Sequence, residues 1–333
     1  MLPPEEIKQI AIFRALQLGD MLCTIPAIRA LKNAYPNAHL TLIGLPWAQS
    51  FVERFSHYFT SFLWFPGYPG LPEQSLNPYA FNVFLDVIHN AKFDLALQMQ
   101  GNGTIVNPIV ALFQAKYTGG FYKRDNYLPK GDLYLEYPNY GPEIDRHLML
   151  MKKLGVEPAG KELEFPISEA DVTDLNLADL QVEPGKYVCI HPGSRGISRQ
   201  WSPAYFAKLA DLAVEAGYKA VITGTKSELD IVEKVKSAMK YEPVIAAGKT
   251  SLGAIAVLIR DAHALISNCT GVSHIAAALQ TKSIIISLHG EAERWSPLNS
   301  ELHRTIDRTK TPDIDLVYRV TENLLKKEKL QTE

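Results

Sequence analysis

Residues 265–280, LISNCTGVSHIAAALQ, contain a strand, a tight polar turn and the beginning of a helix in direct succession. Apolar residues come first. Asn268, Cys269, Thr270 and Gly271 follow and suit a turn, and an alanine-rich run with high helix propensity comes last. We predict that Ser273 caps this helix and that the first backbone N–H groups of the helix form an anion site.

The same strand–turn–helix unit recurs along the chain. In 20–36, DMLCTIPAIRALKNAYP, apolar residues recur every three positions, which predicts one helix. Alternation of strands and helices at intervals of about 20 to 30 residues predicts an α/β protein whose parallel sheets are covered on both faces. The predicted strands lie at 7–16, 39–45, 93–99, 187–193, 219–224, 263–268 and 282–290.

The alternation is interrupted once. Residues 118–142 are aromatic, rich in turn residues and irregular in pattern, and a helix resumes at 143–156. We therefore predict two doubly wound, Rossmann-like domains, at 1–165 and 186–333, joined by a linker or short peripheral helix at 166–185. Ligands of such folds bind at the carboxyl ends of the strands and, where two domains face each other, in the cleft between them.

Composition limits the class of protein. The 333 residues carry a net charge of −2, with a pI near 6.5, which argues against a nucleic-acid partner. Three distant cysteines, Cys23, Cys189 and Cys269, indicate free thiols in a reducing compartment. The N-terminal residues do not resemble a signal peptide, and apolar runs are too short to span a membrane, so we predict a cytoplasmic protein.

The first polar turn, in FRALQLGDML (13–22), places Gly19 and Asp20 after a strand. Asp20 has two interpretations. It is either an N-cap whose carboxylate accepts backbone N–H groups, or a general base at the mouth of a cleft.

The second turn, CIHPGSRGISRQWSP (189–203), has Ser194, Arg195 and Arg199 in a flexible loop before a helix. Two guanidinium groups beside a helix start suit a diphosphate, although an exposed loop with incidental arginines has the same pattern. The spacing matches neither a P-loop nor a dinucleotide-binding glycine motif.

The third turn, VITGTKSELDI (221–231), ends a strand at Gly224 and places Glu228 at a helix start. Glu228 is either a ribose-binding acid or an acid favoured by the helix dipole.

His274, in the fourth turn, is either a ligand contact or a packed side chain, and it has no partners at metal-ligand spacing. Trp64 is predicted to lie in the core, whereas Trp47 either stacks on a sugar or packs in the core.

Taken together, these turns resemble glycosyltransferase family 9, the ADP-heptose:lipopolysaccharide heptosyltransferases. Five segments carry the resemblance in order: 13–38, 191–213, 221–231, 247–279 and 284–290. The resemblance implies the GT-B architecture of two facing Rossmann-like domains, with the acceptor on the first and the nucleotide-sugar donor mainly on the second.

The resemblance also implies roles for individual residues. Asp20 matches the catalytic base, Glu228 the ribose-binding glutamate, and Thr270 with Gly271 the turn that holds the donor diphosphate. His274 matches the histidine that closes this motif.

Three positions depart from the family pattern. Arg199 stands where the family has a phosphate-binding lysine. Gln98 stands where an aspartate is frequent. Cys269 replaces an aspartate that contacts the donor sugar, and a thiol is a weak substitute for a carboxylate. If Cys269 packs inward, Asn268 or Glu291 is expected to supply the sugar contact.

The implied reaction is inverting transfer of a sugar, heptose or a related one, from a nucleoside-diphosphate sugar, with an ADP-sugar favoured. No metal or other cofactor is expected to be required. The acceptor is a lipid-linked or oligosaccharide core or another cell-surface glycan, met by Lys123, Arg124 and Lys130 in the first domain. Such an acceptor implies peripheral association with the inner face of the membrane.

Two alternatives remain at this point. One is a homologue that binds a nucleotide sugar without transferring it. The other is a sugar-nucleotide enzyme of the same fold, such as an epimerase, which would need further acids or histidines in the cleft.

Overall fold

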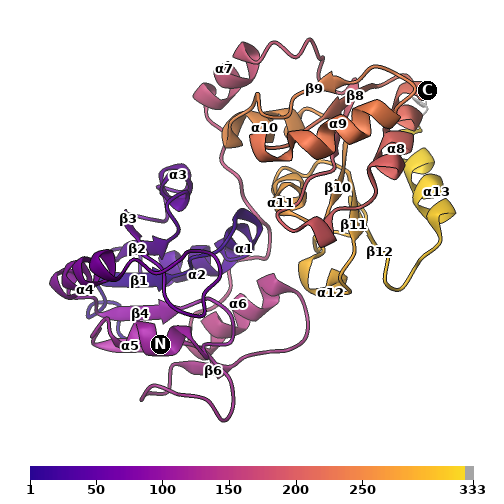
Figure 1. The fold of residues 1–333 in the computed structure, drawn as a ribbon. Helices are drawn as coiled ribbons and strands as arrows, with labels where there is room; N and C mark the ends of the chain where they lie inside the picture. The colour runs from indigo at the N-terminus through magenta and orange to yellow at the C-terminus, as the bar shows by residue number, and fades with distance from the viewer. Residues whose placement is uncertain (327–333) are drawn as a thin grey trace, which may run out of the picture. The chain divides into compact units, whose positions relative to one another are not determined.

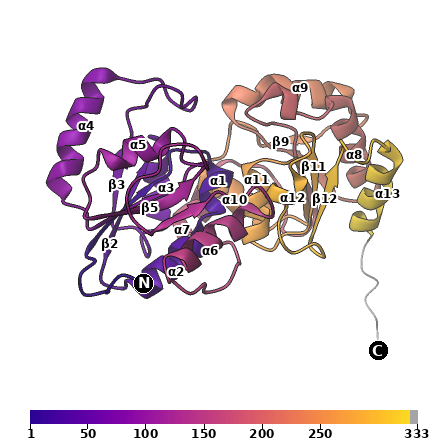
Figure 2. The ribbon, with the colours of Figure 1, turned by 90° about the horizontal axis from the view of Figure 1, so that it is seen from below.

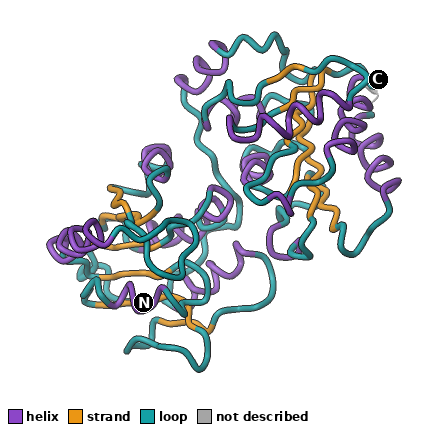
Figure 3. Tube along the Cα trace, viewed as in Figure 1, coloured by secondary structure: helices purple, strands orange, loops and turns teal. Residues whose placement is uncertain are grey.

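The computed structural model describes residues 1–326 and divides the chain into two compact units (Figure 1). The first unit is Met1–Leu163, and the second begins at Glu164. Each unit holds a six-stranded sheet whose strand pairs are all parallel, and the strands form two separate groups in Figure 3.

The sheet of the first unit has the strand order β3-β2-β1-β4-β5-β6. The order reverses direction between β1 and β4, which makes the crevice beside them a topological switch point. The strands are β1 (Gln9–Phe13), β2 (His39–Gly44), β3 (Ser61–Trp64), β4 (Leu95–Gln98), β5 (Tyr117–Tyr122) and β6 (Tyr134–Glu136). The helices are α1 (Leu18–Leu22), α2 (Ile25–Ala34), α3 (Ala48–Arg54), α4 (Pro78–Ala91), α5 (Val106–Ala111) and α6 (Glu143–Lys153).

Side chains of the central strand β1 pack on both faces of this sheet. Ala11 and Phe13 join a buried cluster with Phe84 of α4 and Ile109 of α5. Successive side chains of a strand point to opposite faces, so the buried Ile12 faces the other side. There α2 and α6 lie next to each other (Figure 2). Burial on both faces explains why these strands read as continuous apolar runs.

The sheet of the second unit has the order β12-β11-β10-β7-β8-β9, and its switch point lies between β7 and β10. The strands are β7 (Tyr187–His191), β8 (Lys219–Ile222), β9 (Val244–Ile245), β10 (Ala264–Asn268), β11 (Ser283–Ser287) and β12 (His303–Asp307). The helices are α7 (Glu169–Leu177), α8 (Pro203–Glu215), α9 (Leu229–Ala238), α10 (Leu252–Arg260), α11 (Gly271–Ala278), α12 (Ala292–Trp295) and α13 (Ile314–Leu325), with short 3₁₀ helices η1 (Ile197–Arg199) and η2 (Lys226–Glu228).

One face of the second sheet packs against α8, α9 and α13. Ile190 of β7 and Ile266 of β10 share a buried cluster with Phe206, Val235 and Val317 of these helices. The opposite face meets α10, because the hydroxyl of Tyr187 donates to the carbonyl of Leu258 at 2.7 Å.

Three expectations about the first unit are wrong in detail. The irregular stretch 118–142 contributes β5 and β6 to the sheet. Gly120, inside β5, interrupts the residue pattern that is typical of a strand. A Cβ there would lie 2.4 Å from the carbonyl oxygen of Gln98, so glycine allows β5 to approach β4 closely. The single helix expected at 20–36 divides into α1 and α2, and Thr24 and Pro26 lie at the break.

Trp64 is the third of these expectations. Its side chain is 43 % exposed at the edge strand β3, and its ring nitrogen donates to Gln74 at 3.3 Å. In the stretch expected to be a linker or short helix, α7 begins with a capping box between Ser168 and Asp171 and packs against α10. No helix within residues 1–326 combines the length and the apolar character needed to cross a membrane.

Candidate functional site

Both units place polar side chains at the carboxyl ends of the strands that flank a switch point. In the second unit, the loop 192–201 follows β7 and the turn that holds Cys269 and Thr270 follows β10. β7 and β10 are neighbours in the sheet, so the loop and the turn leave the same edge side by side. The turn with Glu228 follows β8, the other neighbour of β7, so this edge brings together three of the four turns that the sequence singled out.

Asn268 joins these two segments. Its side chain is fully buried, and its amide nitrogen donates to the carbonyls of Pro192, at 2.7 Å, and Gly193, at 3.3 Å. Its amide oxygen accepts the backbone N–H of Trp201 at 3.0 Å. The amide thus holds both ends of the loop 192–201. This arrangement differs from the expected sugar contact, because the polar atoms of Asn268 face the loop and are buried.

The loop itself carries the predicted cations. Ser194 is buried and its carbonyl accepts the side chain of Gln200 at 2.9 Å, which closes the loop on itself. Arg195 is exposed. Arg199 ends η1 with about half of its side chain exposed, and its guanidinium lies 3.5 Å from a carboxylate oxygen of Glu291. Arg199 therefore remains open to an anion.

Helix α11 begins one turn earlier than expected. Its N-cap is Thr270 rather than Ser273, and Ser273 is buried in the first turn with its hydroxyl donating to the Thr270 carbonyl at 2.7 Å. The extended backbone of Thr270 lets the helix start directly at Gly271. The first backbone N–H groups of a helix lack helical acceptors, so this end favours an anion.

His274 is buried in the first turn of α11. Its ring packs edge-on against Trp295 of α12, with 6.3 Å between ring centroids. The side chain therefore contributes to the packing that orients α11.

Cys269 lies between strand and helix. Its backbone N–H donates to Ile286 at 2.9 Å, which extends the pairing of β10 with β11. Burial raises the pKa of its thiol to about 11, with a smaller lowering effect from Arg199 and a raising effect from Glu291. The thiol is therefore protonated at neutral pH and adds no negative charge beside Arg199.

Glu228 is held by a capping box at η2. Its carboxylate accepts both the backbone N–H of Thr225, at 2.8 Å, and the Thr225 hydroxyl, at 2.9 Å. Gly193 packs directly against it, since a Cβ on that glycine would lie 2.2 Å from a carboxylate oxygen of Glu228. Gly224 plays a packing role, with Val232 and Ala247 within contact distance of a Cβ there. Glu228 thus lies at a helix start, as both of its interpretations expect, and its place beside Gly193 keeps it at the edge of the sheet.

Asp20, in the first unit, is not an N-cap. The N-cap of α1 is Gln17, and Asp20 occupies the third helical position with about a quarter of its side chain exposed. The side chain of Arg14, which follows β1, lies 3.9 Å from the Asp20 carboxylate and donates to the Asp20 carbonyl at 3.0 Å. The interpretation as a cap is therefore wrong, and a partly exposed carboxylate at the strand edge remains.

Gln98 ends β4, the neighbour of β1. Its side chain is buried, accepts the backbone N–H of Gln100 at 2.7 Å and donates to the Phe121 carbonyl at 3.2 Å. Gln98 therefore supports the backbone of the strand edge.

The predicted basic residues Lys123, Arg124 and Lys130 lie exposed in the loop that joins β5 and β6. Arg124 forms an ion pair with Glu136 at 2.9 Å. Because β5 is parallel to β1, this loop leaves the same edge of the sheet as Asp20.

Sequence reasoning missed the buried charges behind Asp20. Arg14, Glu143, Arg146 and His147 form a cluster of side chains that are each at most 7 % exposed. The spacing of Glu143, Arg146 and His147 on one helix was a signal, because residues three and four apart share a face. Arg14 directly after an apolar strand was a second signal.

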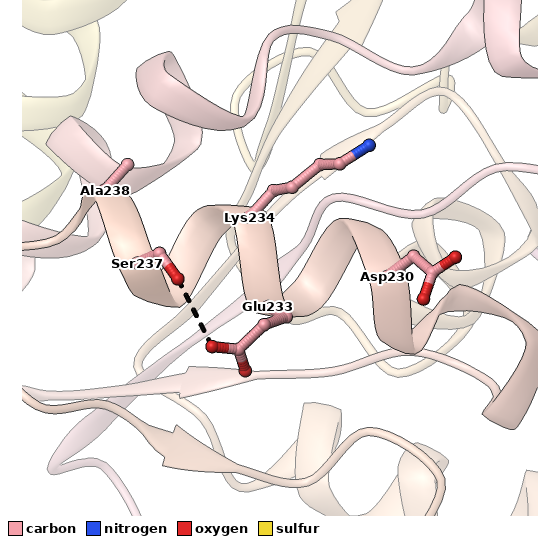
Figure 4. Close-up of a pocket in the computed structure, with 5 residues that line it drawn as sticks. All are labelled: Asp230, Glu233, Lys234, Ser237 and Ala238. Atoms are coloured by element: carbon pink, nitrogen blue, oxygen red, sulfur yellow. Dashed lines mark hydrogen bonds between the residues drawn. The ribbon is translucent and has the colours of Figure 1, made fainter.

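A shallow pocket on α9 offers less chemistry. It is lined by Asp230, Glu233, Lys234, Ser237 and Ala238 of this one helix (Figure 4). Ser237 donates to Glu233 at 3.2 Å within it. These residues are all exposed on a single helix.

The chain is similar to known proteins over most of its length. A family described as glycosyltransferase family 9 (heptosyltransferase) matches residues 84–320. Lipopolysaccharide heptosyltransferase 3 of Escherichia coli is 26 % identical over 298 residues, which cover 85 % of this chain and 84 % of that protein.

Two solved structures share the fold. The ADP-heptose lipopolysaccharide heptosyltransferase II of Escherichia coli has a TM-score of 0.76 at 18 % identity, covering 96 % of this chain and 98 % of its own. The Escherichia coli heptosyltransferase WaaC with ADP has a TM-score of 0.69 at 15 % identity, covering 95 % and 99 %. These neighbours establish two Rossmann-like domains of the GT-B type.

The role of Asn268 can be tested by substitution. Asn268→Ala would remove the partners of three backbone groups, and a buried group left without its hydrogen bond costs about 1 to 3 kcal/mol. We expect a loss of roughly 3 kcal/mol in the free energy of unfolding, measured by urea denaturation, and faster hydrogen exchange in residues 192–201. Asn82→Ala, at an exposed position of α4, is the control. Unchanged exchange in 192–201 would contradict the assignment.

Proposed function

The chain belongs to glycosyltransferase family 9, and from this premise we propose that it is an inverting enzyme that transfers a sugar from an ADP-sugar to a lipopolysaccharide-core or other cell-surface glycan acceptor. The observation that carries the proposal is the strand edge of the second unit. There the loop with Arg199 and the N-terminus of α11 leave neighbouring parallel strands. A cation beside a helix N-terminus is an arrangement that favours the binding of a diphosphate.

The donor is assigned to the second unit. Backbone N–H groups at Thr270 and Gly271 would bind the diphosphate, and Ser194, Arg195 and Arg199 would line it. Glu228, held by Thr225 beside Gly193, would accept hydrogen bonds from ribose hydroxyls. The Escherichia coli heptosyltransferase WaaC, which shares the fold, was solved with ADP, and this favours adenine as the base.

Cys269 distinguishes the sugar site. Its protonated thiol stands at the turn where the resemblance implies an aspartate, within electrostatic reach of Arg199 and Glu291. A site that lacks a hydroxyl acceptor loses the strong discrimination that such an acceptor supplies. We therefore propose that this chain selects its donor sugar differently from the heptosyltransferases to which it is similar.

The reaction proposed is a direct displacement. Asp20 takes the proton of an acceptor hydroxyl, the acceptor oxygen forms a bond to the anomeric carbon, and the bond from that carbon to the diphosphate oxygen breaks on the opposite face. Charge develops on the leaving diphosphate, where Arg199 and the first turn of α11 stabilise it. The anomeric configuration is inverted because the two bonds lie on opposite faces.

The acceptor is assigned to the first unit. Lys123, Arg124 and Lys130 are exposed on the same sheet edge as Asp20, and they suit a phosphorylated or acidic glycan. A lipid-linked acceptor would bring the enzyme to the inner face of the membrane. The alternative of a nucleotide-sugar-binding homologue without transfer predicts donor binding with no turnover, so assays of binding and of transfer separate the two.

Loss of the proposed base should affect turnover alone. We expect Asp20→Asn to lower kcat by about a hundredfold or more, since general base catalysis contributes about 10² to 10⁴. ADP binding should stay within about threefold of wild type, because the donor is assigned to the other unit. Transfer is measured with ADP-heptose, ADP-glucose and UDP-glucose on lipopolysaccharide of truncated core. Asp86→Asn, on exposed α4, is the control, and a full rate for Asp20→Asn would refute the role.

Arg199 should act on phosphate. A charge-assisted hydrogen bond contributes on the order of 1.5 to 3 kcal/mol, so Arg199→Ala should weaken ADP binding by about ten- to a hundredfold. Adenosine binding should change little. Calorimetry with both ligands measures the difference, and Arg319→Ala, an exposed arginine of α13, is the matched control. Equal losses for ADP and adenosine would show that Arg199 acts on the base or on the order of the loop.

Cys269 should redirect donor choice. We expect the wild-type chain to use ADP-heptose poorly and Cys269→Asp to raise kcat/KM for ADP-heptose by about tenfold, the effect of one charged hydrogen bond. Cys269→Ser, which adds no acid, should change it little. Efficient wild-type transfer from ADP-heptose that the aspartate leaves unchanged would contradict the assignment. In that case Glu291 is the next residue to substitute.

A further inference from the structure

The surroundings of Asp20 contain a buried arginine that the proposed reaction does not use. Arg14 follows β1, and its side chain is 1 % exposed, which makes it one of the large side chains that are almost fully buried. Burying a guanidinium is costly unless its charge and its N–H donors are satisfied. The partners of Arg14 therefore indicate what this residue does.

Arg14 joins three elements at the carboxyl edge of the first sheet. Its Nε donates to the backbone carbonyl of Asp20 at 3.0 Å, in the last turn of the five-residue helix α1. Its Nη1 donates to the backbone carbonyl of Met99, just after β4. Its Nη2 lies 3.3 Å from the Glu143 carboxylate at the start of α6. A single planar group thus fixes α1 relative to β4 and α6.

Glu143 is itself held from the other side. Nε2 of His147 lies 3.2 Å from the Glu143 oxygen that Arg14 contacts, whereas Arg146 lies 3.9 Å from the other oxygen, beyond hydrogen-bond distance, and does not hold Glu143 in place. All these side chains are at most 7 % exposed. Glu143 therefore sits in a fixed place and limits the rotamers open to Arg14.

We propose that Arg14 is a positioning residue for Asp20 and that Glu143 fixes Arg14. This inference rests on the proposed function, because it takes Asp20 as the base. Arg14 sets the backbone of Asp20 through the carbonyl. Its guanidinium lies 3.9 Å from the Asp20 carboxylate, beyond hydrogen-bond distance, so the two side chains interact only through their charges.

Substitution separates this role from a structural one. Arg14→Met keeps the side-chain volume, and Glu143 keeps His147 as a partner. Arg146→Met is the matched control. Arg146 is comparably buried and shares Glu143, but it donates its hydrogen bonds to the Tyr140 carbonyl and the Tyr137 hydroxyl. A displacement of about 1 Å in a catalytic group can lower a rate about a hundredfold.

We expect Arg14→Met to lower kcat by about a hundredfold while KM for the donor stays within about threefold of wild type. The assay uses the donor that the wild-type chain consumes fastest among ADP-heptose, ADP-glucose and UDP-glucose. Hydrolysis of the donor by water counts as turnover in this choice. Arg14→Lys, which keeps the charge but not the fork, should recover part of the loss. Arg146→Met should lower kcat by less than about threefold. A normal kcat in Arg14→Met, or an equal loss in Arg146→Met, would overturn the proposal.

A double-mutant cycle tests whether Arg14 acts through Asp20. If it does, adding Arg14→Met to Asp20→Asn should lower kcat no further, since residues that act as a unit are not additive. Additive losses would overturn the proposal. A full rate for Asp20→Asn alone would instead refute the proposed base, so the two failures are distinguishable.

Hydrogen exchange supplies a readout that needs no turnover. Arg14→Met should raise exchange in residues 18–24, which include α1, whereas Arg146→Met should leave those residues as in wild type. Exchange unchanged by Arg14→Met would also overturn the proposal. If Arg14→Met does not fold, Arg14→Lys and Glu143→Gln carry the same comparison.

Discussion

In each unit, one buried polar side chain bridges the switch point of the sheet. Arg14 reaches from the end of β1 to the backbone after β4, and Asn268 reaches from the end of β10 to the loop after β7. The loops on the two sides of a switch point run to opposite faces of the sheet and diverge. Their backbone groups therefore need other hydrogen-bond partners where they are buried. These two side chains supply the partners, and the loop that carries Arg199 and the short helix that carries Asp20 are held by them.

The two bridges differ in chemistry, and the difference matches the proposed tasks. Asn268 is neutral and satisfies backbone groups, so the positive character of the second edge comes from Arg199 and from the N-terminus of α11. Arg14 is charged and belongs to a cluster balanced by Glu143. The neutral amide of Asn268 leaves the positive character of the second edge to a charged donor. Arg14, in contrast, places a positive charge near the carboxylate proposed as the base.

Polar residues at the strand edges thus divide into a scaffold and an open surface. Asn268 and Gln98 are buried and hold backbone, while Arg199 and Glu291 remain partly exposed at the strand edge. Cys269 stands at the boundary: its backbone N–H pairs with β11, and its protonated thiol is influenced by the opposite charges of Arg199 and Glu291. Burial, more than residue type, decides which polar groups remain available to a ligand.

The sequence by itself determined the α/β class, the two sheets and the strand ends that carry the polar turns, because apolar periodicity and turn residues are local signals. It did not reveal β5 and β6, where Gly120 disguises a strand, nor that Asn268 faces a loop 67 residues distant along the chain. The cluster of Arg14 with Glu143 spans 129 residues. Only the tertiary structure decided these features, because the burial of a polar group and the identity of its partner depend on which strands become neighbours.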